Sequence, residues 1–259
     1  MKPILRECLT DLKAAVRIGH PDAVQSALDN LRSLPDELVP PNDLPALGIA
    51  LVPLPIHMLT DLFNDPDPAI RALASIALGE HYLSQKDVQP GALTPAANDP
   101  NPEVRRVFAQ FLLKSINQFY DKEPAFERLH QLVLTWANSK FPIITETALQ
   151  ILTGLSLSAE EVYQYLEPLD KFTEHHVRAE LVQCLNTLGD RGYQETIFFI
   201  LTTWSQRSEP NVWVITRALS GSWAQANSER AVLILNQLAK QIGQIRAIKR
   251  ALSHHQVNF

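Results

Sequence analysis

The sequence contains few glycines, few cysteines and no long uninterrupted apolar run. Nine glycines in 259 residues, beside many Leu, Ala and Gln, favour helices over a turn-rich β fold. The two cysteines, Cys8 and Cys184, resemble neither a disulfide framework nor a metal site. The longest apolar run, residues 44–56, is broken by prolines and is too short to span a bilayer. We therefore expect an all-α cytoplasmic protein that has no partner in the membrane.

The sequence also lacks the common signatures of catalysis and cofactor binding. It contains no His-Glu-x-x-His, no paired Cys-x-x-Cys and no phosphate-binding glycine loop. The adjacent histidines at 175–176 and 254–255 would point about 100° apart on a helix, so neither pair suits one metal ion. We expect these histidines in exposed turns, and we predict no catalytic residue, cofactor or metal. A non-enzymatic protein is the interpretation that follows, with an enzyme on the same frame as an open alternative.

A repeated turn is the clearest feature that is present. The sequence Asp-Pro-Asn-Pro-Glu-Val-Arg at 99–105 nearly repeats Asp-Pro-Asp-Pro-Ala-Ile-Arg at 65–71, 34 residues earlier. A fixed period of this size is typical of stacked helical hairpins. The apolar residue that follows each turn, taken as position zero, recurs at steps of 34, 40, 33, 35 and 33 in Ile70, Val104, Ile144, Val177, Val212 and Ile245.

Positions three, four and seven after each zero are mostly apolar, which is the stripe of an amphipathic helix. This register predicts a core that includes Phe108 and Leu181. Each of these helices follows another apolar helix, for which the candidates are 59–63, 93–97, 126–136, 162–169, 197–204 and 232–242. We predict a helical cap and proline-rich connection at 1–55, with a short helix at 47–51, and a single continuous stack of repeats at 56–259.

The Asp-Pro-x-Pro-x-(Val/Ile)-Arg turn followed by an Ala/Leu-rich helix resembles a HEAT repeat. The resemblance covers about residues 56–259 and implies a right-handed α-solenoid of antiparallel helical pairs, while it says little about function. In HEAT-like repeats the turn arginine usually pairs with turn carboxylates. Asp65, Asp67 and Asp99 are suitably placed for this, and the arginines at the corresponding positions are Arg71, Arg105, Arg178 and Arg246.

The helix face opposite the core stripe is predicted to line the concave surface. Small, apolar and amide residues dominate it, including Ala72 and Ala109, which we expect to tolerate polar substitution. Such a lining suits a segment of a partner protein, so we interpret the chain as an interaction scaffold or adaptor. The predicted partner-binding residues are Arg106, Gln110, Gln150, Gln183, Trp213, Arg217, Arg246, Arg250 and His254.

An uneven distribution of charge leaves a second function open. Residues 190–259 carry eight Lys or Arg against four Asp or Glu, whereas residues 1–99 carry seven against thirteen. Aromatic residues among these cations could stack bases while the cations neutralise phosphates. These aromatics are Tyr193, Trp204, Trp213 and Trp223. The alternative interpretation places Trp204 in the core and Trp223 over the end of the stack.

Two families supply the remaining alternatives by resemblance alone. The stretches 198–213 and 246–252 are similar in character to HEAT-like DNA-alkylation-repair glycosylases, which implies nucleic-acid binding. No catalytic residue of that family aligns with a position here. HEAT-like proteins also include the bilin lyases, which attach or detach bilins with a partner subunit, and this is the third alternative.

Overall fold

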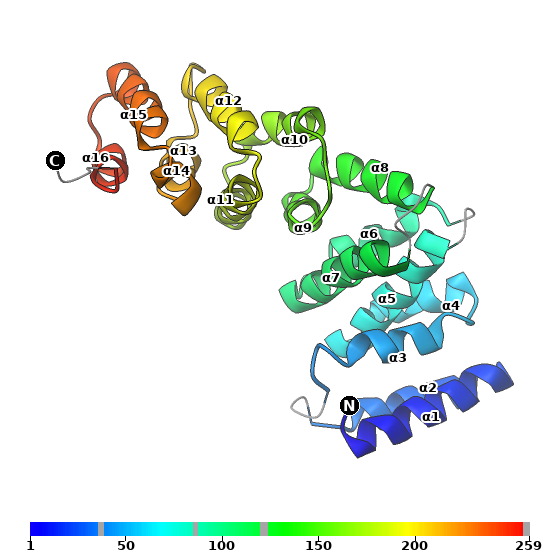
Figure 1. The fold of residues 1–259 in the computed structure, drawn as a ribbon. Helices are drawn as coiled ribbons and strands as arrows, with labels where there is room; N and C mark the ends of the chain where they lie inside the picture. The colour runs from blue at the N-terminus through cyan, green and yellow to red at the C-terminus, as the bar shows by residue number, and fades with distance from the viewer. Residues whose placement is uncertain (36–38, 85–87, 120–123, 256–259) are drawn as a thin grey trace. The chain divides into compact units, whose positions relative to one another are not determined.

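The computed structural model describes residues 1–35, 39–84, 88–119 and 124–255, and all regular elements in these ranges are helices. The chain divides into two compact units, residues 1–133 and 134–259, which are described separately below. Within each unit the helices stack as antiparallel pairs, which is the all-α solenoid architecture that the sequence predicts (Figure 1). The predicted division at residue 55 and the single continuous stack stay predictions.

In unit 1, four of the α-helices begin at a proline. Pro3, Pro21, Pro68 and Pro102 each occupy the first position of a helix, where the missing N–H and the fixed φ angle favour helix initiation. The helix predicted at 47–51 begins earlier, at Leu44. The helices are α1 (Pro3–Ile18), α2 (Pro21–Arg32), α3 (Leu44–Leu51), α4 (Ile56–Asp61), α5 (Pro68–Ser84), α6 (Thr94–Ala97), α7 (Pro102–Phe119) and α8 (Ala125–Ala137), which crosses the unit boundary, with 3-10 turns η2 (Leu62–Asn64) and η3 (Pro90–Leu93).

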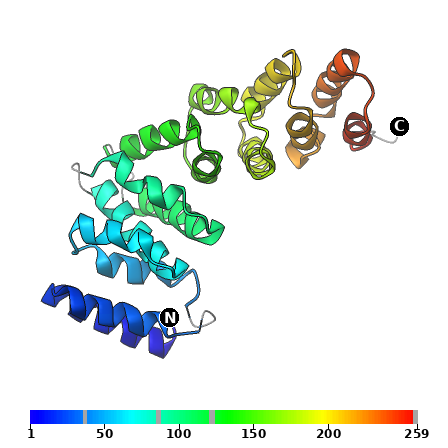
Figure 2. The same ribbon diagram turned by 180° about the vertical axis from the view of Figure 1, so that it is seen from behind.

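Unit 2 consists of two layers of helices. α10, α12 and α15 pack side by side in one layer, and α9, α11, α13 and α16 form the other (Figure 1 and Figure 2). Ser158 and Glu161 form a capping box at the start of α10. The elements are α9 (Pro142–Leu152), α10 (Ala159–Leu166), η4 (Glu167–Lys171), α11 (His175–Asp190), α12 (Gln194–Ser205), α13 (Val212–Ala218), α14 (Ser222–Gln225), α15 (Ser228–Ile242) and α16 (Arg246–Ser253).

The apolar zero position of the predicted register is buried in the first four repeats, half-buried at Val212 in the fifth and exposed in the last. Phe108 and Leu181 are fully buried. Ile245, by contrast, is 42 % exposed and serves as the N-cap of α16, because the chain turns at Gly243 with a φ of 88° just before it. The buried side of α16 is formed by Ile248, which the register places there, and by Ala251, which it does not.

The expectation for Ala72 and Ala109 is also wrong. Each alanine is only 2 % exposed. α5 packs against α3 on one side and α7 on the other, so this helix has almost no solvent-facing side between them. A side chain opposite the core stripe is therefore buried here as well, and a polar group would be desolvated.

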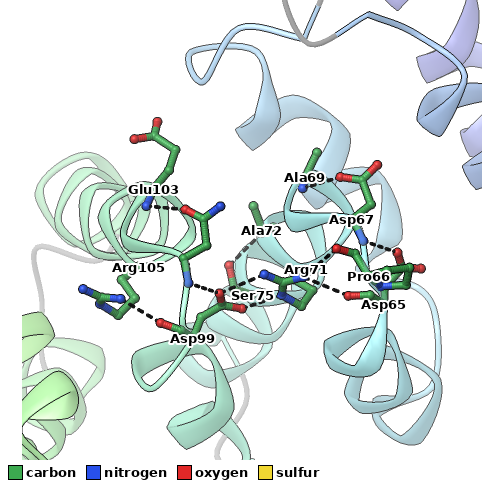
Figure 3. A network of polar contacts seen from close by, with 11 residues as sticks. Asp65, Pro66, Asp67, Ala69, Arg71, Ala72, Ser75, Asp99, Glu103 and Arg105 are labelled. Atoms are coloured by element: carbon green, nitrogen blue, oxygen red, sulfur yellow. Dashed lines mark hydrogen bonds and ion pairs between the residues drawn. The ribbon is translucent and has the colours of Figure 1, made fainter.

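The arginine of the repeated turn joins one repeat to the next in unit 1 (Figure 3). Arg71 Nε donates to Asp99 Oδ2 at 2.7 Å and Arg71 Nη2 donates to Asp99 Oδ1 at 3.1 Å, so the pair is bidentate. Arg71 Nη1 also donates to the Asp65 carbonyl of its own turn at 2.9 Å. Asp65 in turn pairs with Arg32 of α2. The predicted pairing of this arginine with turn carboxylates is thus confirmed for Arg71.

Arg105 and Asp67 stabilise the same turns by other bonds. Arg105 Nη1 donates to the Asp99 carbonyl oxygen at 2.7 Å. Asp67 Oδ1 accepts the backbone N–H of Ala69 at 2.8 Å, which caps the first turn of α5. The carboxylate and the arginine of each turn therefore both bond to the backbone of that turn.

Candidate functional site

An open groove of about 460 Å³ lies between α13 and α16 in unit 2. Five of the nine predicted partner-binding residues line it: Trp213, Arg217, Arg246, Arg250 and His254. The other lining residues are small, namely Thr216, Ser220, Ala247 and Ala251. The structure therefore brings together the C-terminal half of the predicted set in one place.

α16 supplies three of these side chains from one face. Arg246, Arg250 and His254 follow one another at intervals of four residues and are exposed, so they lie in a row along the groove. Ala247 and Ala251 lie beside them and leave the space open. Both the row of cationic side chains and the open space beside it result from the alternation of long cationic residues and alanines along α16.

α13 supplies Trp213 and Arg217 from the other side. The Arg217 guanidinium lies over the Trp213 ring, 5.7 Å from its centroid. The guanidinium of Arg178 on α11 also lies over this ring at 5.4 Å, and the His175 ring is 5.6 Å away. Trp213 is thus a half-buried aromatic residue that positions two arginines by cation–π contact.

The groove is cationic without compensation. In the part of the chain that the structure describes, no carboxylate lines it, and none forms an ion pair with Arg217, Arg246 or Arg250. α16 carries Arg246, Lys249 and Arg250 and no acidic residue. Like charges four residues apart, and cations in the first turn of a helix, both lower helix stability. The arrangement therefore favours binding of an anion.

The repeat explains why the turn arginines of unit 2 do not pair as Arg71 does. The position five residues before each zero is Asp65 and Asp99 in unit 1, where Arg71 finds its partner. In the later repeats the same position is Ser139, Phe172, Arg207 and Lys240. Arg207 pairs backward with Glu167 and Asp170. The ladder predicted for Arg178 and Arg246 is therefore wrong: Arg178 lies over Trp213 and Arg246 lines the groove.

The other four predicted residues lie elsewhere. Arg106 and Gln110 are exposed on α7 of unit 1, and Arg106 forms a surface ion pair with Glu103. Gln150 on α9 is half-buried, and its Oε1 atom is buried without a hydrogen-bond partner. Gln183 on α11 is exposed. None of the four lines the groove.

Two of the four candidate stacking aromatics, Trp204 and Trp223, are buried and unavailable to a base. Trp204 is fully buried and donates from Nε1 to the Glu167 carbonyl at 2.9 Å. Trp223 is 2 % exposed and donates to Asn186 Oδ1 at 2.9 Å. The Tyr193 hydroxyl donates to the Leu157 carbonyl at 2.6 Å. The core position predicted for Trp204 is confirmed. Trp223 is buried against Phe198 and Gly189 rather than over the end of the stack.

The prediction of an exposed turn is wrong for His255, which lies near the groove and is buried. Its Nε2 atom lies 2.6 Å from the Leu219 carbonyl oxygen. Its Nδ1 atom lies 3.3 Å from Ser228 Oγ. His255 therefore joins the end of α16 to the elements that follow α13, and so helps to fix the width of the groove. The only signal in the sequence is its place seven residues after Ile248 on the buried side of α16.

Unit 1 contains a hollow of its own. It measures about 370 Å³ and has a largely apolar lining that includes Leu31, Leu44 and Val107. In the described ranges, no three His, Cys, Asp or Glu side chains are grouped as metal ligands would be. Within the same ranges, none of the helices combines the length and the apolar character that crossing a bilayer requires.

Comparison with known proteins adds no family. No family model and no curated protein matches the chain. Two solved structures that do match are both titled as crystal structures of engineered proteins. The first is 14 % identical and covers 77 % of this chain and 94 % of its own, with a TM-score of 0.36. The second is 13 % identical and covers 99 % of each chain, with a TM-score of 0.33.

Proposed function

We propose that the protein is a HEAT-like cytoplasmic interaction scaffold that holds an acidic segment of a partner protein in the groove between α13 and α16. The observation that carries the proposal is the gathering of Arg217, Arg246 and Arg250 around one hollow without a described carboxylate. Such a site attracts anionic chains at long range and orients them by arginine forks at short range.

The confinement of the cations to one groove favours a protein segment over duplex DNA. The residue five positions after each zero is an arginine in α13 and α16. The corresponding residue is Leu149 in α9 and Val182 in α11. DNA-binding proteins commonly neutralise several successive phosphates, which needs cations along a continuous track. Trp213, the stacking candidate that lines the groove, already contacts two guanidinium groups.

The test is equilibrium binding of a fluorescently labelled, glutamate-rich peptide to the full chain. A peptide of equal length with glutamine in place of glutamate is the ligand control. We expect binding of the acidic peptide alone, weakening as salt is added. The Arg250→Glu variant should lose at least about tenfold in affinity, equivalent to about 1.4 kcal/mol.

Lys249→Glu is the matched protein control. Lys249 is exposed on the same helix as Arg250 but does not line the groove, so both variants change the charge of α16 equally. Equal losses in the two variants would show that net charge, not the groove, binds the peptide. Tighter binding of a DNA duplex than of the peptide at the same salt concentration would move the function to nucleic acid.

A further inference from the structure

We infer that the groove between α13 and α16 recognises a phosphate monoester, as on a phosphorylated serine or threonine of the bound segment. The inference rests on the proposed function, since it names the chemical group by which the partner's segment is held. It goes further because a phosphorylated segment would bind and its unmodified form would not.

The charge of the groove matches a phosphate monoester better than a carboxylate. Arg217, Arg246 and Arg250 bring three permanent positive charges to one hollow. A carboxylate carries one negative charge and two oxygen atoms. A phosphate monoester carries about −1.5 to −2 near neutral pH and offers three strong acceptor oxygens. One such group can accept hydrogen bonds from several arginines at once.

The positions of the arginines suit one compact anion. Arg246 and Arg250 are four residues apart on α16, so their Cβ atoms are roughly 5–6 Å apart. Arg217 approaches from α13 on the other side of the groove. A tetrahedral group placed between the helices can therefore meet guanidinium N–H groups from both sides, as bidentate arginine–phosphate pairs require.

Trp213 prepares one of these arginines for binding. Arg217 lies over the indole ring, and a stacked guanidinium keeps the N–H groups at its edge free to donate. Arg178 and His175 hold the same ring from α11. Arg217 thus loses less side-chain entropy on binding than a freely moving arginine would.

The small residues of the groove provide the room. Ala247 and Ala251 line the α16 side, and Thr216 and Ser220 line the α13 side. Both hydroxyls donate to carbonyl oxygens of their own helix, at 2.8 Å to Val212 and Thr216 respectively. The hollow of about 460 Å³ exceeds the size of one phosphate group, so residues that flank the modified side chain also fit.

The experiment compares three otherwise identical peptide pools with the full-length protein. Each pool has randomised flanking positions and a fixed central residue, which is phosphoserine, glutamate or serine. We expect the phosphoserine pool to bind at least about tenfold more tightly than the glutamate pool, and the serine pool not to bind. Free O-phosphoserine should displace the bound peptides and should shift the NMR signals of the arginine Nε–H groups, whereas free glutamate should do neither.

Two variants separate phosphate recognition from simple charge attraction. Arg250→Lys keeps the charge but loses the planar fork, so it should weaken the phosphoserine pool and leave the glutamate pool nearly unchanged. Lys249→Glu should affect neither pool by more than about twofold. Circular dichroism of each variant checks that the helices are intact.

The outcomes distinguish the inference from the function on which it rests. Equal affinity for the phosphoserine and glutamate pools, both lost in Arg250→Glu, would overturn the inference and leave the acidic-segment scaffold standing. No binding of either pool would overturn both. Stronger binding of an oligonucleotide than of the phosphoserine pool would assign the groove to phosphodiesters and overturn both as well.

Discussion

The Arg71 guanidinium grips both carboxylate oxygens of Asp99, a residue 28 positions later in the turn of the next repeat. Asp99 is 3 % exposed and also accepts the Asn101 backbone N–H through Oδ1 at 2.8 Å. The hydrogen bonds from Arg71 to this carboxylate raise the pKa of Arg71. One acidic side chain therefore caps its own turn and ties it to the preceding repeat (Figure 3).

Removing this carboxylate should destabilise unit 1 strongly. Asp99→Ala leaves Arg71 largely buried without its partner, which should lower the free energy of unfolding by about 3–5 kcal/mol. Arg106→Ala is the control, because it removes an exposed pair with Glu103 and should cost at most about 1 kcal/mol. Urea denaturation measures both. Similar losses would mean that the Arg71–Asp99 pair has no more weight than a surface pair.

Gly189 should not tolerate a side chain. A Cβ atom there would lie 2.5 Å from Trp223 Cγ, and the indole is fixed by its hydrogen bond to Asn186. Gly189→Ala should therefore cost about 1–3 kcal/mol in unfolding free energy through overpacking. Gly91→Ala, where nothing lies within 4 Å, should be neutral or stabilise by up to about 1 kcal/mol. Thermal denaturation of the two variants makes the comparison, and a neutral Gly189→Ala would show that Trp223 packs elsewhere.

Cys184 should be unreactive until unit 2 unfolds. Complete burial raises the pKa of its thiol, so the thiolate that reacts with alkylating reagents is scarce near neutral pH. The folded state also keeps its proton above the unfolded thiol pKa of about 8.5, so stability is full below that pH and falls as the pH rises past it. Above that pH, each further pH unit should lower the free energy of unfolding by about 1.4 kcal/mol.

The rate of Cys184 alkylation and the slope of stability against pH measure these two effects. The Cys184→Ala variant lacks this thiol, so its free energy of unfolding should fall less steeply with pH above about 8.5 than that of the unmodified protein. Fast alkylation of Cys184 under native conditions would contradict its burial.

The sequence predicted the fold well because the repeat is kept by packing, and it predicted the groove only in part. The spacing of apolar residues placed Phe108 and Leu181 correctly, since helices stacked at a fixed period must bury the same face. Periodicity could not reveal that the chain turns at Gly243, which moves Ile245 out of the core. It also could not show that Ala72 is covered from both sides, because burial there depends on neighbouring helices rather than on the helix itself.

The fate of the repeated arginine shows the same limit. A motif predicts which residue type recurs, but its partner comes from another repeat. Arg71 pairs because Asp99 stands at the matching position, whereas Arg178 has Arg207 there and turns to Trp213. The position that supplies the partner carboxylate became apparent only from the observed Arg71–Asp99 pair.

The corrected register of the last repeat can be tested by truncation. Leu181→Ala removes a fully buried side chain and should cost about 2–5 kcal/mol. Ile245→Ala removes a side chain that is 42 % exposed and should change the free energy of unfolding by less than about 0.5 kcal/mol. Chemical denaturation measures both, and a loss at Ile245 as large as that at Leu181 would restore the register that the sequence suggested.

Arg217, Arg246 and Arg250 line one groove, and crystallography can test whether they bind a single anion. The most direct measurement is a crystal of the full chain soaked with tungstate, a tetrahedral oxyanion that stands in for phosphate and is located by its anomalous scattering. We expect an anomalous-difference peak of tungstate in the groove between α13 and α16, within hydrogen-bond distance of at least two of the three arginines. The peak should be absent from crystals of the Arg250→Glu variant. Tungstate found only at other sites, in crystals whose lattice leaves the groove open, would contradict it.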